Sequence, residues 1–123
     1  MLEKGLTYTS QTVVSIQNTA RALGSGDMDV FATPAMAALM ENAAMLCVAP
    51  YLPQGSTTVG SMISTSHLKP SALGAEIAAT AVLSEVNGRK LTFKVTASEN
   101  GQIIGGGTHV RYIVDRIRFM EKL

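Results

Sequence analysis

The sequence predicts an α+β fold in which a five-stranded, mostly antiparallel sheet wraps around one long central helix. Between Val30 and Leu52 the chain is uncharged apart from Glu41 and rich in Ala, Met and Leu, which favours a helix that other elements enclose. Most of the remaining chain carries the β-branched residues and turn signals of strands. At 123 residues we expect one domain, residues 1–123, with its elements in the order β-α-β-β-β-β.

The first strand and the helix have recognisable limits. A stretch rich in Thr, Val and Ile, Tyr8–Thr19, is expected to form the first strand. Thr33 is expected to cap the helix, and Pro34 suits the first helical position, where its missing N–H is not needed. The helix should end near Ala49, because Pro50 follows.

Four more strands are expected after the helix. The pairs Asn87-Gly88 and Asn100-Gly101 are the hairpin signals, and between them Leu91, Phe93 and Val95 alternate with polar residues. The expected strands are 57–68, 75–86, 91–98 and 102–117.

Composition and charge argue against several classes of protein. A net charge of +1 with scattered basic residues, and no Trp, argues against nucleic-acid binding. A membrane span is disfavoured because Pro34 and Pro50 interrupt the apolar run and Glu41 would sit near the bilayer centre. Cys47 is a single cysteine in this run, and we interpret it as a small buried apolar residue. No apolar leader is present, so we expect a cytoplasmic location.

Glu41 is the first candidate for catalysis, because it is the only charge in the apolar run. A carboxylate in apolar surroundings loses hydration that stabilises its charged form, which costs stability. Such a placement is typical of functional residues. The alternative is that Glu41 lies on a solvated stripe of a surface helix.

His67 is the second candidate, in a stretch of small, hydroxyl-bearing residues that leaves space beside it. Alone it would be a structural histidine, but its strand can lie alongside the helix and pair it with Glu41. Thr33 and Glu41 are eight residues apart, about 12 Å along a helix at about 1.5 Å per residue. They can therefore meet only if Thr33 lies on a bent-in loop or if helices of two subunits pack together.

His109 and Arg111 share one face of the final strand, which is either solvated or functional. In the functional alternative, Arg111 lines a groove and meets a phosphate or an acyl carbonyl. No metal site is expected, because two histidines and one cysteine show no ligand spacing. The run Gly105-Gly106-Gly107 opens no helix, so it indicates a bulge or a close backbone approach and not a phosphate loop.

Three stretches in order, together with the element order, resemble the fluoroacetyl-CoA thioesterase-like family of hot-dog fold thioesterases. They are 32–41 (ATPAMAALME), 59–68 (VGSMISTSHL) and 107–111 (GTHVR). The resemblance covers nearly the whole chain, and its specificity lies in the order and spacing of the stretches. It implies that Thr33, Glu41 and His67 are catalytic and that Gly60 and Arg111 lie near the acyl pocket.

The resemblance also implies a reaction: hydrolysis of a small acyl-CoA thioester by a homodimer or higher oligomer with its sites at the subunit interface. Glu41 would act as base or nucleophile, while His67 moves a proton and Thr33 attacks or positions the water. No cofactor is expected, because CoA is part of the substrate, and a fluorinated acyl group is not implied. Two alternatives remain open: a hydratase or dehydratase on the same fold, and a non-catalytic acyl-CoA-binding module.

Overall fold

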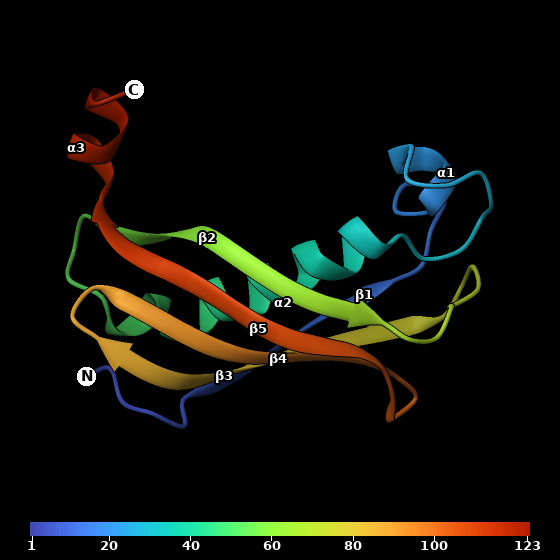
Figure 1. Ribbon diagram of the computed structural model, residues 1–123, viewed down its shortest axis with the longest axis horizontal. Coiled ribbons are helices and arrows are strands. Elements are labelled where there is room, and N and C mark those ends of the chain that lie inside the picture. The colour runs from blue at the N-terminus through green and yellow to red at the C-terminus, as the bar shows by residue number, and fades with distance from the viewer.

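The sheet has five strands in the order β1-β3-β4-β5-β2, and all four neighbouring pairs are antiparallel. The predicted fold class and element order are therefore confirmed, with short helical segments added. The computed structural model describes residues 1–123. Figure 1 shows α2 lying along one face of the sheet. The strands are β1 Thr7–Val13, β2 Ser56–His67, β3 Glu76–Asn87, β4 Lys90–Glu99 and β5 Gln102–Asp115.

The central helix α2 spans Thr33–Val48, and a 3-10 turn, Ala49–Tyr51, continues it. The helix therefore ends near the predicted residue, but it begins differently. Ala32 holds the N-cap position and Thr33 is already helical, so the prediction that Thr33 caps the helix is wrong. The physical reason is that the Thr33 hydroxyl bonds to His67 instead of to the helix backbone. No helix of the chain combines the length and apolar character needed to cross a membrane.

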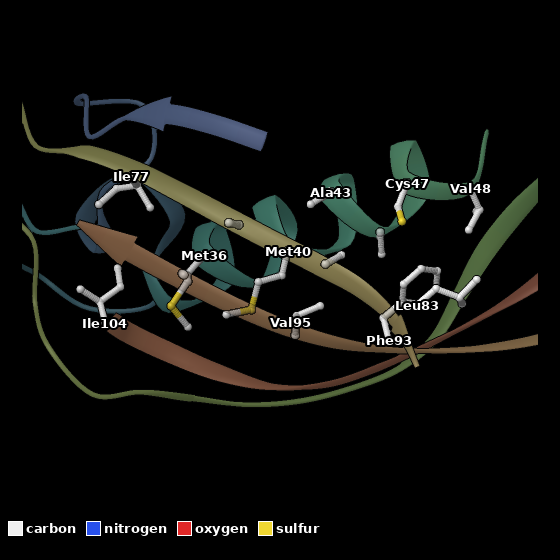
Figure 2. Packing of buried hydrophobic residues seen from close by; sticks show 14 of the residues in the cluster. Met36, Met40, Ala43, Cys47, Val48, Ile77, Leu83, Phe93, Val95 and Ile104 are labelled. Carbon is white, nitrogen blue, oxygen red and sulfur yellow. The ribbon is translucent and has the colours of Figure 1, made fainter. Parts of the chain in front are cut away.

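The core lies between α2 and the middle strands of the sheet. Figure 2 shows Met36 and Met40 directed from the helix toward the strands, with Val95 next to Met40 and Phe93 further along, beside Leu83. The predicted alternation of β4 is confirmed, because its apolar side chains are fully buried. The buried residues of α2 are Met36, Met40, Ala43, Ala44, Cys47 and Val48, and those of β3 and β4 are Ile77, Ala79, Ala81, Leu83, Leu91, Phe93, Val95 and Ala97.

The sheet covers α2 unevenly. The helix packs mainly against β1 and β3 and makes few contacts with β2. Its other side remains partly or fully exposed, including Ala37, Ala38 and Glu41. One sheet therefore leaves an apolar helix incompletely covered.

Two short helices were not predicted: one begins directly after the predicted strand 8–19, and the other overlaps only the last two residues of the predicted strand 102–117. β1 ends at Val13, and α1 (Ala20–Leu23) follows, with Thr19 Oγ1 accepting from the Ala22 N–H. β5 ends at Asp115, which caps α3 (Arg116–Glu121). Figure 1 shows α3 projecting beyond the end of β5. In both cases a side-chain oxygen satisfies a free helical N–H, which favours the start of a helix at that residue.

The glycine run in β5 marks a close approach to β2 and α2, as predicted. A Cβ on Gly105 would lie 2.5 Å from the Ser66 carbonyl oxygen and 2.7 Å from Met36 Sδ. A Cβ on Gly107 would collide with the Ser64 carbonyl oxygen. Only glycine allows these two strands and the helix to pack this closely.

The two hairpins form close to their predicted positions. Asn100 and Gly101 both have positive φ and connect β4 to β5 as predicted. The first turn is shifted by one residue, because Asn87 pairs with Lys90 and leaves Gly88 as the first turn residue.

Candidate active site

Thr33 and His67 form the first polar pair. Thr33 opens α2 and His67 ends β2, and Thr33 Oγ1 lies 2.8 Å from His67 Nδ1. Phe31 packs edge-on against the imidazole, with ring centroids 6.3 Å apart. Burial lowers the pKa of His67 from its ordinary value of 6.5, so the ring is neutral near neutral pH. A neutral histidine bonded to a hydroxyl is the arrangement of a nucleophile and its base.

An open cavity of about 260 Å³ lies beside this pair. Thr33 and His67 line it together with the apolar side chains of Val30, Phe31 and Pro70. His67 Nε2 is buried and has no hydrogen-bond partner. The cavity is small compared with typical ligand sites.

Glu41, Gly60, His109 and Arg111 form a second cluster further along α2. Gly60 lies in β2 beside a bulge at which Ser61 has no partner residue on β5. A Cβ on Gly60 would lie 3.2 Å from His109 Cε1, 3.3 Å from Arg111 Nη1 and 3.4 Å from Glu41 Oε1. Three polar side chains therefore converge on the space that the missing Gly60 side chain leaves free.

Hydrogen bonds hold Arg111 in place inside the protein. Its Nε donates to Thr58 Oγ1 at 2.7 Å and its Nη2 to the Thr58 carbonyl oxygen at 2.9 Å. Its Nη1 lies 3.2 Å from His109 Nε2. Burial lowers the pKa of Arg111, the nearby charge of Glu41 opposes this shift, and the guanidinium stays charged. Both residues of this strand face are buried, so the alternative of a solvated face is wrong.

The structure joins the predicted residues into two groups and does not bring all five together. Thr33 and Glu41 belong to one continuous helix, eight residues or about 12 Å apart. The expectation that His67 pairs with Glu41 is wrong within one chain, because the end of β2 reaches the start of α2 and not its middle. Glu41 forms no ion pair, since the single salt bridge of the chain joins Arg21 and Asp29.

Several contacts of the site were not predicted. The sequence did indicate that His109 and Arg111 lie side by side, because residues two apart in a strand share a face. Nothing in the sequence indicated the contact of Thr58 with Arg111, because only the register of β2 against β5 places the two side by side. Phe31 was likewise missed, because its contact with His67 depends on how the chain enters α2.

Comparison with known proteins points to one enzyme family. The sequence model of the family described as fluoroacetyl-CoA-specific thioesterase matches residues 14–117. The fluoroacetyl-CoA thioesterase of Streptantibioticus cattleyicolor is 37% identical over 95 residues, which are 77% of this chain and 68% of that protein.

Solved structures agree with this match. A solved structure of the fluoroacetyl-CoA thioesterase superposes with a TM-score of 0.92 at 33% identity, covering 99% of this chain and 95% of that one. A mutant of that enzyme in complex with fluoroacetate and CoA has a TM-score of 0.90 at 33% identity, with coverage of 96% and 99%. A thioesterase superfamily member from Thermus thermophilus has a TM-score of 0.90 at 25% identity, with coverage of 98% and 89%.

Proposed function

This chain belongs to the fluoroacetyl-CoA-specific thioesterase family and is a hydrolase of acyl-CoA thioesters, and we propose that it acts on small acyl groups at a site shared by two copies of the chain. In this proposal Thr33 and His67 come from one copy, and Glu41, Gly60 and Arg111 come from the other. The observation that carries it is the 2.8 Å contact between Thr33 Oγ1 and His67 Nδ1, at the wall of a small open cavity.

In the first half of the proposed reaction, the Thr33 hydroxyl attacks the thioester carbonyl while His67 Nδ1 takes its proton. The C–S bond then breaks, the proton passes to the sulfur, and CoA leaves as a thiol. The acyl group remains on Thr33 as an ester. Helix α2 begins without a side-chain cap, so the N–H groups of its first turn are candidates for stabilising the oxyanion.

In the second half, Glu41 of the other copy acts as base toward a water molecule. The water gives a proton to Glu41 and attacks the Thr33 ester, the carboxylic acid leaves, and Glu41 returns the proton to the Thr33 oxygen. Arg111 supplies a fixed positive charge next to Glu41, and the absence of a side chain at Gly60 lets both groups lie close to the β2 backbone. Arg111 is 6% exposed, which suits a role inside a closed site and not a role as a surface anchor for phosphate.

The proposed homodimer explains how two groups about 12 Å apart along one helix can form one site. β2 is a 12-residue edge strand with a neighbour on one side only, and an unpaired edge of this length favours pairing with another chain. A two-fold axis near the middle of β2 would pair it with its copy in antiparallel fashion. With the axis between Ile63 and Ser64, His67 of one strand would lie opposite Gly60 of the other.

Other features fit the same proposal. A cavity of about 260 Å³ suits a short acyl group, and nothing in its lining calls for a fluorine atom. Water and the side chains named above supply the whole reaction, so no cofactor is required beyond the CoA of the substrate. Cys47 is buried and unpaired, which fits the proposed cytoplasmic location, where thiols stay reduced.

The decisive experiment combines a thiol-release assay with intact-protein mass spectrometry. The wild type should release CoA from short acyl-CoA thioesters and lose activity as the acyl chain lengthens. Glu41→Gln should lose most turnover, remain folded and accumulate the acyl group on Thr33. Thr33→Ala serves as the matched control, which should form no adduct.

Three outcomes contradict the proposal in different ways. Absence of thiol release from any short acyl-CoA would reject the substrate class. Wild-type turnover by Glu41→Gln would reject the role of that carboxylate. An acyl group found on Glu41 in the Thr33→Ala variant would make Glu41, and not Thr33, the nucleophile.

A further inference from the structure

His109 is a buried ionisable residue to which the proposed function assigns no role. It is 1% exposed and lies on β5, two residues before Arg111. The Phe93 ring lies alongside the imidazole, with centroids 6.2 Å apart. A histidine held this firmly inside the second cluster has a fixed orientation, so the role of each ring nitrogen can be assigned.

The two ring nitrogens of His109 have opposite roles. Nδ1 lies 2.8 Å from the Met62 carbonyl oxygen, which only accepts, so Nδ1 carries the proton and donates it. Nε2 lies 3.2 Å from Arg111 Nη1, which only donates, so Nε2 accepts. Burial lowers the pKa of His109, and the charge of Arg111 lowers it further, against the opposing effects of the Met62 bond and Glu41. The ring is therefore neutral and free to accept from the guanidinium.

We propose that His109 is a positioning residue that holds Arg111 Nη1 in the space above Gly60, facing Glu41. The inference rests on the proposed function, in which Arg111 and Glu41 act together. Thr58 accepts both hydrogen bonds from the edge of the guanidinium that carries Nε and Nη2. These two bonds by themselves would allow the guanidinium plane to rotate about that edge. The bond from Nη1 to His109 lies at the third nitrogen and fixes the plane of the group.

Two substitutions separate the roles of the two ring nitrogens. In His109→Asn the short amide can still donate to Met62 but does not extend to Arg111. In His109→Gln the longer side chain can place its oxygen near the Nε2 position and accept from Arg111. Thr108→Asn is the control, because Thr108 is the exposed neighbour of His109 on the same strand.

We expect His109→Asn to lower kcat by roughly 10²-fold, the scale associated with a misplacement of about 1 Å at a reacting centre. KM should change much less. His109→Gln should recover most of the lost kcat, and Thr108→Asn should match the wild type. In a double-mutant cycle, His109→Asn should cost little further activity once Arg111 is replaced by Lys, because it acts through Arg111.

A second measurement does not depend on activity. In ¹⁵N NMR spectra of the wild type, His109 should show a protonated Nδ1 and an unprotonated Nε2 near neutral pH. A protonated Nε2 would overturn the proposal, as would equal losses of kcat in the Asn and Gln variants or additive losses in the cycle. If His109→Asn does not fold, the tautomer and the activity of His109→Gln decide the question. Failure of the proposed function looks different, because Glu41→Gln would then keep wild-type turnover whatever the tautomer of His109.

Discussion

Two inactive variants should restore activity when their subunits are mixed. Thr33 and Glu41 lie in one continuous helix about 12 Å apart, too far to act on the same carbonyl carbon within one chain. Thr33→Ala and Glu41→Gln should each be inactive as homodimers. After the two are unfolded and refolded together in equal amounts, about half of the dimers are mixed, and one of the two sites in each mixed dimer carries neither substitution. The mixture should therefore regain about a quarter of the wild-type turnover per chain.

The assay is thiol release from a short acyl-CoA, and the structure supplies a matched negative control. Thr33 and His67 contact each other within one chain, so mixing Thr33→Ala with His67→Ala leaves a defect in every site and should restore nothing. Mixing His67→Ala with Glu41→Gln should restore as much as the first pair. Mixed dimers that stay inactive in the Thr33→Ala and Glu41→Gln experiment would refute the shared site, and a monomer by light scattering would refute the dimer itself.

Three further predictions address single groups. His67→Ala should lower kcat by about 10²–10⁴-fold, as expected for a general acid–base residue, and a change confined to KM would make it a binding residue. Gly60→Ala should lower turnover with little change in thermal stability, because its Cβ would lie 3.2 Å from His109 Cε1 and 3.4 Å from Glu41 Oε1; unchanged steady-state kinetics would contradict this. The free energy of unfolding in urea should decrease as the pH falls below 6.5, because burial lowers the folded-state pKa of both His67 and His109 and the unfolded chain binds protons first. A flat stability profile from about pH 8 to about pH 5 would contradict the buried, neutral state of these histidines.

Local sequence patterns were sufficient to predict the structure wherever one interaction dominates. The alternation in β4 reports which side chains enter the core, and Asn100-Gly101 forms its hairpin because both residues take positive φ. Prediction failed where another interaction replaced the expected one. Thr19 and Asp115 each cap a short helix that the strand pattern did not indicate, and Thr33 gives its hydroxyl to a histidine 34 residues away instead of capping α2.

The sequence by itself determined the fold class, the element order and the candidate site residues, because helix and strand periodicities and isolated polar residues are local properties of a chain. Only the tertiary structure decided which of those residues meet. The 2.8 Å contact of Thr33 with His67, and the hold of Thr58 and His109 on Arg111, depend on the register of β2 against β5 and on where β2 ends beside α2. Register is set by the packing of the whole sheet, and a shift of one residue would turn His109 and Arg111 away from Glu41.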